Sequence, residues 1–367
     1  MSVKYHEGKF PPTQLDWERL AIPLERASTA VSRYDSFLGL IPDSSIMLAP
    51  MLVQEAVASS RMEGTHATVG DVLAYEAGNE FDSAKNDDVL EVVNYRRALH
   101  KSVEMLNDLP LSGRVLKSAH KILLHNVRGS FKSPGQYRND QNWIGRSNKI
   151  EEARYIPIPP EKLEDAMASW ERFVNESSMP SLIKVSIAHA EFESIHPFRD
   201  GNGRIGRMLV PLMLNLDGLI SHPCLYLSEF FEHRNSEYQD RLLAVSSDDL
   251  WTDWCVFFLS AIETQAKEND RKAHSIYDLY KDTLLRTMAK IKADGVEEAV
   301  SCLFRQAVFP SNIFINKAGL SESTSRRLIK LLKDEELVIE IRPHRGSSPA
   351  ILAFPRLLEI TENVTLA

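Results

Sequence analysis

One unbroken string of twelve residues constrains this chain more than any other feature of its sequence. It reads His196-Pro197-Phe198-Arg199-Asp200-Gly201-Asn202-Gly203-Arg204-Ile205-Gly206-Arg207. Glycines let backbone N–H groups close around an anion, and arginines bind phosphate oxygens in a fork. A carboxylate holds Mg²⁺ together with phosphate oxygens, and a histidine takes a proton near neutral pH. The string therefore predicts a site that handles a nucleotide phosphate.

Two helices are predicted to flank this string. Apolar residues recur at helical spacing over 181–195, and Pro197 ends that helix because proline cannot continue it. A second apolar run begins at Arg204 and ends at Gly218, with Pro211 inside it, where we expect a distortion. The glycines therefore lie at the N-terminus of a new helix, where N–H groups and the helix dipole attract anions.

The string resembles the signature of the Fic family, H-P-F-x-[D/E]-G-N-G-R-x-x-R, at every defined position. Most members of that family transfer AMP from ATP to a hydroxyl side chain of a target protein. The resemblance implies a mostly helical Fic fold with a β-hairpin flap. Related kinases of the Doc type carry Lys where this chain has Gly203, which argues against a phosphotransferase.

The resemblance also implies a role for each residue. His196 would deprotonate the target hydroxyl, and Asp200 would hold Mg²⁺ between the α- and β-phosphates. Arg204 would bind the β-phosphate and Arg207 the γ-phosphate. The nucleotide-binding residues implied in this way are Gly201, Asn202, Gly203, Arg204, Ile205, Gly206 and Arg207. A helix from about residue 237 resembles the element that closes over adenine and ribose, with Tyr238 as the ring contact. An ordinary buried tyrosine fits that position equally well.

A second constellation lies upstream, at the end of a helix predicted over 51–62. Ser59 and Glu63 are four residues apart and so share a helical face, and Gly64 then breaks the helix. The segment is similar to the Fic inhibitory motif, [S/T]-x-x-x-E-[G/N]. The resemblance implies that Glu63 pairs with Arg207 and denies the γ-phosphate its ligand. The alternative is an exposed glutamate at a helix end.

A hairpin is predicted between these two motifs. Apolar runs at 143–145 and 154–158 are joined by a polar stretch. Prolines at 157 and 159 indicate an edge strand with unpaired backbone groups. The segment resembles the Fic flap, which binds an extended target segment by strand addition, here at Tyr155 and Ile156. An ordinary surface hairpin is the alternative.

The pattern changes after about residue 297. Helices over 312–318 and 321–335 and strands over 337–342 and 350–354 predict a winged helix. Several basic residues there could face phosphates: Arg326, Arg327, Lys330, Arg342 and Arg345. Neighbouring acidic residues offset them, which disfavours DNA as a partner.

The expected parts are an N-terminal helical region with the inhibitory helix over 1–95, a catalytic core over 96–265, a connecting helix over 266–296 and a winged helix over 297–367. The net charge of −8 argues against broad binding of nucleic acid. The three cysteines are scattered and form neither a disulfide framework nor a zinc pattern. No apolar run approaches the roughly 20 residues of a membrane span. We expect a cytoplasmic protein without a membrane partner.

The predicted function is transfer of AMP from ATP to Ser, Thr or Tyr of a protein, with Mg²⁺ required and Glu63 holding the enzyme in check. Two alternatives stay open. One is a bifunctional or reverse enzyme in which Glu63 positions water and AMP is removed. The other is a DNA-binding regulator whose nucleotide site is a sensor. Self-modification and a homodimer also stay open.

Overall fold

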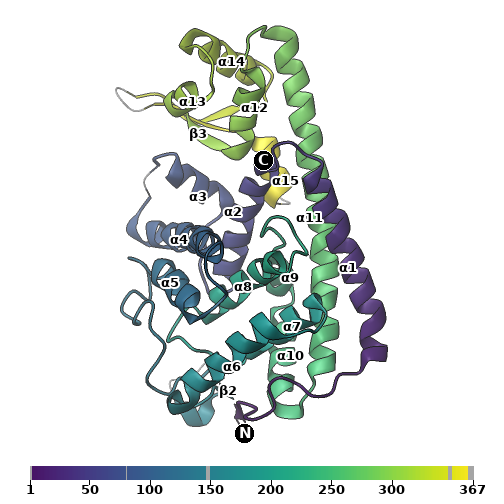
Figure 1. Ribbon diagram of the computed structural model, residues 1–367. Helices are drawn as coiled ribbons and strands as arrows, with labels where there is room; N and C mark the ends of the chain where they lie inside the picture. The colour runs from purple at the N-terminus through teal and green to yellow at the C-terminus, as the bar shows by residue number, and fades with distance from the viewer. Residues whose placement is uncertain (1, 80, 146–148, 346–348, 363–367) are drawn as a thin grey trace. The chain divides into compact units, whose positions relative to one another are not determined.

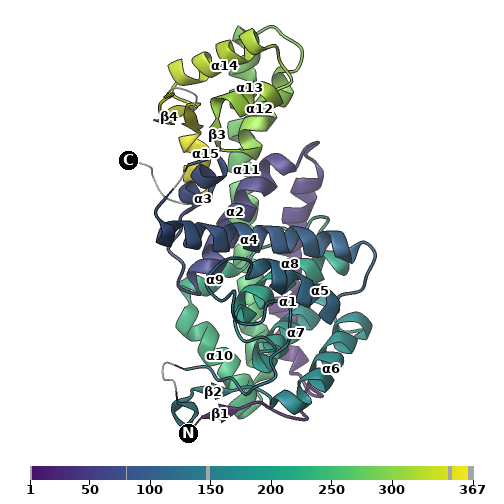
Figure 2. The same ribbon diagram turned by 90° about the vertical axis from the view of Figure 1, so that its left-hand side faces the viewer.

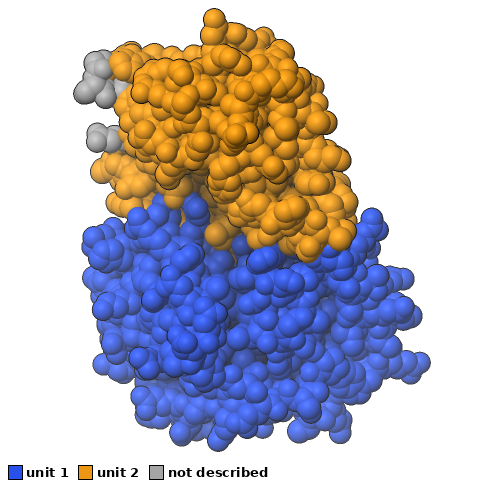
Figure 3. Space-filling view, turned by 45° about the horizontal axis from the view of Figure 1, so that its top comes forward, with its two compact units in different colours: residues 1–36, 58–65, 93–267 blue, residues 37–57, 66–92, 268–367 orange. Residues whose placement is uncertain are grey.

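The computed structural model describes residues 2–79, 81–145, 149–345 and 349–362 (Figure 1). Helices make up most of the described residues, which confirms the predicted mostly helical fold. Contacts divide the chain into two compact units, coloured separately in Figure 3. The first unit comprises residues 1–36, 58–65 and 93–267, and the second comprises 37–57, 66–92 and 268–367.

The first unit contains the helices that carry the predicted site. They are α5 (Gly113–Leu123), α6 (Leu163–Glu176), α7 (Ser181–Ile195), α8 (Asn202–Leu216), α9 (Ser228–His233) and α10 (Asn235–Asp248). Nearly all of α7 is buried, and it packs against α6, α8 and α10 (Figure 2). A helix that is apolar around most of its circumference forms where neighbours cover it. The core of this unit is therefore built around α7.

Four helices contain a boundary between the two units: α1 (Trp17–Gly39), α2 (Ser45–Arg61), α4 (Ser83–Leu106) and α11 (Trp251–Lys290). The helix predicted over 51–62 begins earlier, at Ser45, and continues through Pro50. The connecting helix predicted over 266–296 is the second half of α11. Buried Trp251, Trp254 and Phe258 extend the helical spacing back into the core, so no break occurs near residue 266.

The second unit contains α3 (Val69–Glu76) and a group of C-terminal elements. These are α12 (Val296–Arg305), β3 (Val308–Pro310), α13 (Ser311–Lys317), α14 (Glu322–Asp334), β4 (Ile339–Arg342), β5 (Ile351–Ala353) and α15 (Pro355–Glu362). The strands form an antiparallel sheet in the order β3-β5-β4. Two helices and two strands closely match the predicted ranges, whereas α12 and β3 were not predicted. Residues 346–348 of the predicted loop between β4 and β5 lie outside the described residues.

Among the described residues, no helix is both long enough and apolar enough to cross a membrane. Charged and polar side chains buried in the first unit gather where α7 meets α8. Burying such groups costs free energy unless partners satisfy them, so the meeting point of α7 and α8 is the candidate site.

Candidate active site

The signature string forms the turn between α7 and α8. Helix α7 ends at Ile195, and His196 follows in the left-handed conformation, with φ 51°. Gly201 precedes α8, also left-handed, with φ 76°. A Cβ atom on Gly201 would lie 3.2 Å from the Leu123 side chain, so both the conformation and the space favour glycine. This turn sets the first N–H groups of α8 beside His196.

Side chains inside and outside the string hold this turn in place. Asn202 accepts from the Phe198 N–H and donates to the Phe198 carbonyl, both at 2.8 Å. His120 accepts at Nδ1 from the Gly135 N–H at 2.8 Å, so its Nε2 carries the proton that bonds the Asp200 carbonyl at 2.9 Å. Burial lowers the pKa of His120 to about 4, which keeps this neutral tautomer. His120 belongs to no sequence motif, and its partners Gly135 and Asp200 lie 15 and 80 positions away, so the sequence did not predict its role.

Arg138 is a second residue that the sequence analysis did not assign. Its Nε donates to the His196 carbonyl at 3.0 Å, and its backbone N–H donates to the Pro197 carbonyl at 2.9 Å. Its Nη2 also donates to the carbonyl of Ile158, beyond the flap strand. Burial lowers the pKa of Arg138 to about 10, which still leaves the side chain charged at neutral pH. Arg138 therefore connects the turn between α7 and α8 with the segment that follows β2.

His196 has the protonation state that a general base needs. Its Nδ1 lies 3.3 Å from the Glu193 carbonyl, which can only accept, so Nδ1 carries the proton. The lone pair is then on Nε2. Burial lowers the pKa of His196 to about 4, so the imidazole is neutral at physiological pH.

Glu63 and Arg207 meet in the first unit, as the resemblance implied. Arg207 Nη2 donates to Glu63 Oε1 at 2.8 Å and to the Ser59 carbonyl at 2.8 Å, and Arg207 Nε donates to Ser59 Oγ at 2.9 Å. Burial favours the neutral acid, but Arg207 outweighs it and holds the pKa of Glu63 below its ordinary value. Glu63 is therefore a carboxylate at neutral pH.

Because Gly203 has no side chain, the Glu63–Arg207 ion pair lies close to the first turn of α8. A Cβ atom on Gly203 would lie 2.5 Å from Glu63 Oε1 and 2.8 Å from Arg207 Nη1. A side chain at this position would displace the Glu63–Arg207 pair. The carboxylate of Glu63 thus lies against the helix terminus that is predicted to bind phosphate.

Asp200 is the predicted magnesium ligand, and its surroundings fit that ion. Its side chain is 37% exposed, and Oδ1 lies 3.4 Å from Arg204 Nη2. Gly129 allows a close approach, since a Cβ there would lie 2.8 Å from Asp200 Oδ2. Among the described residues, no group of three or more His, Cys, Asp or Glu could hold a metal. One carboxylate beside a phosphate site is the donor set that Mg²⁺ takes with nucleotides.

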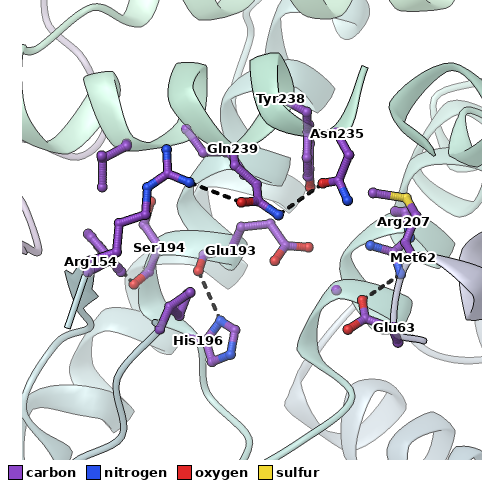
Figure 4. Close-up of a pocket in the computed structure, with 15 residues that line it drawn as sticks. Met62, Glu63, Arg154, Glu193, Ser194, His196, Arg207, Asn235, Tyr238 and Gln239 are labelled. Atoms are coloured by element: carbon purple, nitrogen blue, oxygen red, sulfur yellow. Dashed lines mark hydrogen bonds and ion pairs between the residues drawn. The ribbon is translucent and has the colours of Figure 1, made fainter. Parts of the chain in front are cut away.

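Four of these residues, Glu63, His196, Gly203 and Arg207, line one pocket of about 180 Å³ (Figure 4). Asp200 and Arg204 lie outside its lining. Its walls come from α7, α8, α10 and the flap, and include His196, Arg207, Tyr238 and Tyr155. Three of the predicted nucleotide-binding residues line this pocket: Gly203, Arg207 and Tyr238. The others do not line it: Gly201, Asn202, Arg204, Ile205 and Gly206. Ile205 is 1% exposed and belongs to the core.

Tyr238 is both buried and part of the pocket wall. His189 donates from Nδ1 to the Gly206 carbonyl at 3.0 Å, so its Nε2 accepts from the Tyr238 hydroxyl at 2.9 Å. Burial lowers the pKa of His189 to about 3, in keeping with a neutral ring. The Tyr238 ring stacks on Phe231 with centroids 4.5 Å apart. These contacts fix the ring of Tyr238 at the pocket.

The flap strand is paired on both sides. β2 (Tyr155–Ile156) pairs in parallel with β1 (Val3–Lys4), and Tyr155 pairs with Ile144 in antiparallel fashion. The Ile156 carbonyl accepts from the Tyr5 N–H at 3.0 Å, and the Tyr155 carbonyl accepts from the Ile144 N–H at 2.9 Å. The prediction of an edge strand with unpaired backbone groups is therefore wrong here. The N-terminal segment supplies β1, a strand too short to show a period in the sequence. Residues 146–148 of the hairpin lie outside the described residues.

Comparison with known proteins identifies the family. The model described as Fic/DOC family N-terminal matches residues 22–104, and the model described as Fic/DOC family matches residues 110–214. Together they span just over half of the 367 residues. The chain belongs to the Fic/DOC family.

Curated relatives match over part of their length. A probable protein adenylyltransferase, aq_aa38 of Aquifex aeolicus, is 31% identical over 36% of this chain and 41% of that protein. Protein adenylyltransferase fic-1 of Caenorhabditis briggsae is 26% identical over 32% of this chain and 20% of that protein. A uridine 5'-monophosphate transferase of Xanthomonas campestris pv. campestris is 33% identical over 24% and 18%. The chain thus spans less than half of each of these relatives.

Solved structures share the fold. A Fic family protein from Desulfovibrio desulfuricans G20 superposes with a TM-score of 0.60 at 21% identity, over 94% of this chain and 98% of that one. Fic-1 from C. elegans superposes with a TM-score of 0.56 at 19% identity, over 71% and 74%. The helical Fic fold that the resemblance implied is confirmed.

Proposed function

We propose that this protein transfers AMP from ATP to a Ser, Thr or Tyr side chain of a protein, and that Glu63 holds this activity in check. One observation carries the proposal: the neutral His196, Gly203 at the N-terminus of α8 and Arg207 line a single pocket of the first unit, and Arg204 follows Gly203 on α8, beside Asp200. Residue types alone occur together by chance, whereas this geometry satisfies each chemical need of nucleotidyl transfer.

The transfer step uses these residues as follows. His196 Nε2 takes the proton of the target hydroxyl as its oxygen bonds to the α-phosphorus, and the bond to the leaving pyrophosphate breaks. Arg204, Arg207 and the N-terminus of α8 stabilise the negative charge that builds on the phosphate oxygens. Positioning and charge stabilisation supply most of the catalysis in reactions of this class.

Asp200 would hold Mg²⁺ in this site. The ion, when bound, neutralises charge on the phosphates and on the departing pyrophosphate. Arg204, beside Asp200, has a side chain only 3% exposed and so keeps a fixed position next to the bound phosphates.

Glu63 restrains the reaction through Arg207. Its carboxylate pairs with the guanidinium that would bind the γ-phosphate, and its negative charge repels the phosphate. ATP then binds with its α-phosphate out of line with the incoming hydroxyl. Removing the carboxylate should raise kcat more than ATP affinity, because alignment and not binding is what improves.

Self-labelling with α-labelled ATP and Mg²⁺ tests both parts of the proposal. The parent, Glu63→Gly, and Arg207→Ala in the Glu63→Gly background are compared, with added AMP located by mass spectrometry. We expect Glu63→Gly to raise labelling roughly tenfold or more, and Arg207→Ala to cancel that gain. An unchanged rate in Glu63→Gly would reduce Ser59 and Glu63 to an ordinary helix end.

Removal of AMP is a second candidate, favoured by the ionised state of Glu63. A carboxylate at the phosphate site can orient a water molecule for attack on AMP-modified protein. Release of AMP from modified protein is compared between the parent and Glu63→Gly. Faster release with Glu63 present supports this activity, and equal release in both excludes it.

The names of the relatives include both AMP and UMP transfer, so membership of the family does not by itself decide which nucleotide base this chain binds.

For partners, we propose a protein target that reaches the pocket beside the flap, and a C-terminal winged helix that binds protein and not DNA. Acidic neighbours pair with two of its basic residues: Lys333 lies 2.6 Å from Glu340, and Arg326 lies 2.7 Å from Glu322.

A further inference from the structure

Glu193 differs from the other polar side chains of the pocket because one of its oxygens is unused. Arg154 Nη1 donates to Gln239 Oε1 at 3.1 Å, and Gln239 Nε2 donates to Asn235 Oδ1 at 2.9 Å, so these three satisfy one another (Figure 4). Oε1 of Glu193 is buried and accepts no hydrogen bond from any residue that the structure describes. Buried polar atoms are rarely left in this state, and a ligand is one way to satisfy them.

The fold makes room for this carboxyl group. Glu193 lies on α7, one turn before His196, and faces α8. A Cβ atom on Gly206 would lie 2.1 Å from Glu193 Oε1, so any side chain at Gly206 would displace the carboxyl. Figure 4 shows the carboxyl group directed into the pocket, among His196, Tyr238 and Arg207. The glutamate is therefore built into the wall of the pocket and does not extend into bulk solvent.

The lining around Glu193 suits a flat ring. Tyr238, Leu242 and Leu243 of α10 and Ile144 of the flap give this part of the pocket an apolar surface. Ligand pockets commonly combine such a surface with one or two polar groups that fix orientation. A phosphate offers oxygen acceptors and negative charge, neither of which satisfies a carboxyl oxygen. The base of a nucleotide offers both apolar faces and N–H donors.

We propose that Glu193 accepts a hydrogen bond from the exocyclic amino group of the nucleotide base, and so selects adenine over uracil. The inference rests on the proposed nucleotide site. Adenine presents an amino group beside a ring nitrogen, whereas uracil presents a carbonyl oxygen at the corresponding place. A carbonyl oxygen facing the carboxylate form of Glu193 would leave two acceptors opposed in a buried site, which disfavours uracil when Glu193 is ionised.

Either protonation state of Glu193 supports this contact. Burial raises the pKa of Glu193 to about 7, with Arg207 opposing the rise and Glu63 adding to it. The carboxylate accepts from the amino group. The neutral acid accepts with one oxygen and donates with the other to the ring nitrogen, which is the acceptor–donor edge that a glutamine amide also presents. Glu193→Gln should therefore preserve recognition, whereas Glu193→Ala and Glu193→Leu should remove it.

Calorimetric binding with Mg²⁺ tests the inference with three probes: ATP, UTP and purine riboside triphosphate, which lacks the amino group. We expect the parent to prefer ATP over purine riboside triphosphate roughly tenfold or more. Glu193→Gln should keep most of that preference, and Glu193→Ala and Glu193→Leu should lower the ratio to about one. Leucine fills the volume of the glutamate, so it separates a lost contact from a cavity. Glu164→Ala, which removes an exposed carboxyl on α6, is the control expected to match the parent.

Two results would overturn the inference. One is equal binding of ATP and purine riboside triphosphate by the parent, and the other is an unchanged preference in Glu193→Leu. Deoxy-ATP is a further probe. If Glu193→Ala and Glu193→Leu lost the preference for ATP over deoxy-ATP but kept the preference for ATP over purine riboside triphosphate, Glu193 would contact the sugar and not the base. Because nucleotide binding is measured separately from AMP transfer, either result would contradict only the role of Glu193 and not the proposed transfer of AMP. Failure of every nucleotide to bind would instead contradict the proposed function itself.

Discussion

The arginines of the two units face opposite environments, although the sequence offers both sets as phosphate ligands. In the first unit the side chains of Arg204 and Arg207 are each 3% exposed. In the second unit the side chain of Arg326 is 66% exposed and pairs with Glu322 one turn away on the same helix. Burying a guanidinium costs free energy that only well-placed partners offset. Burial with organised partners therefore distinguishes the arginines proposed to bind phosphate from the exposed arginines of the second unit, whereas residue type alone does not.

The largest effect is expected in the first unit, from His196→Ala. In the Glu63→Gly background this substitution should lower AMP transfer roughly 10²–10⁴-fold, because the base that accepts the hydroxyl proton is lost. ATP affinity should change little, since the base acts on the hydroxyl and not on the nucleotide. Labelling rates and calorimetric ATP binding measure the two quantities. His233→Ala, at an exposed histidine of the same unit, is the matched control. Near-parental transfer by His196→Ala would remove His196 from the mechanism.

Asp200→Ala should have the next largest effect, a loss of roughly 10²-fold in transfer. The remaining activity should no longer respond to Mg²⁺, because the carboxylate that would hold the ion is gone. A titration of Mg²⁺ against labelling rate measures this, with Asp165→Ala at an exposed position of α6 as the control. A Mg²⁺ response that persists in Asp200→Ala at the parental concentration range would assign the ion to other ligands.

Local sequence patterns were sufficient where a contact lies within one element or one motif. The apolar spacing predicted a helix over 181–195, and α7 runs over Ser181–Ile195. The inhibitory resemblance implied a pair between Glu63 and Arg207, and the two side chains lie 2.8 Å apart. Both predictions depend on residue spacings: helical periodicity sets the first, and the two Fic motifs set the second.

Contacts between distant segments could not be predicted in the same way. His120 bonds the backbone of Asp200, and Arg138 bonds that of His196, through partners that only the folded chain brings near. Strand β1 has two residues, too few for an alternating pattern. In the sequence, Glu193 is an ordinary charged residue of a helix. Only the packing of α7 against α8 shows that its Oε1 is buried beside Gly206. Each of these features depends on tertiary packing, which a single sequence does not reveal.

Lowering the pH should reduce the stability of the first unit more than that of the second. Burial lowers the pKa of three histidines in the first unit, to about 4, 3 and 4 for His120, His189 and His196. The described histidines of the second unit are exposed: His66, His274 and His344. A depressed pKa gives stability that is present above the unfolded value of roughly 6.5 and lost as the pH falls toward the folded value.

Each buried histidine should cost the first unit about 1.4 kcal/mol per pH unit below roughly pH 6.5. Glu193 acts in the opposite sense, because its raised pKa lets the folded state take up a proton, and it offsets about one histidine. Hydrogen exchange at pH 7 and pH 5 measures the difference, and protection should fall in α7 and α8 more than in α13 and α14. Equal losses in both units would show that the buried histidines do not control acid stability.

The smallest effect is expected from Arg326→Gln, the counterpart of Arg207→Gln in the other unit. An exposed pair four residues apart on a helix contributes only about 0.3–0.5 kcal/mol, and salt screens it further. Arg326→Gln should therefore leave urea stability and AMP transfer close to the parent. Arg207→Gln should lower both, because it leaves the carboxylate of Glu63 and the buried hydroxyl of Ser59 without their partner. The two substitutions are chemically identical, so only the surroundings differ. If Arg326→Gln changed stability or transfer as much as Arg207→Gln, burial would not be what distinguishes the functional arginines of this protein.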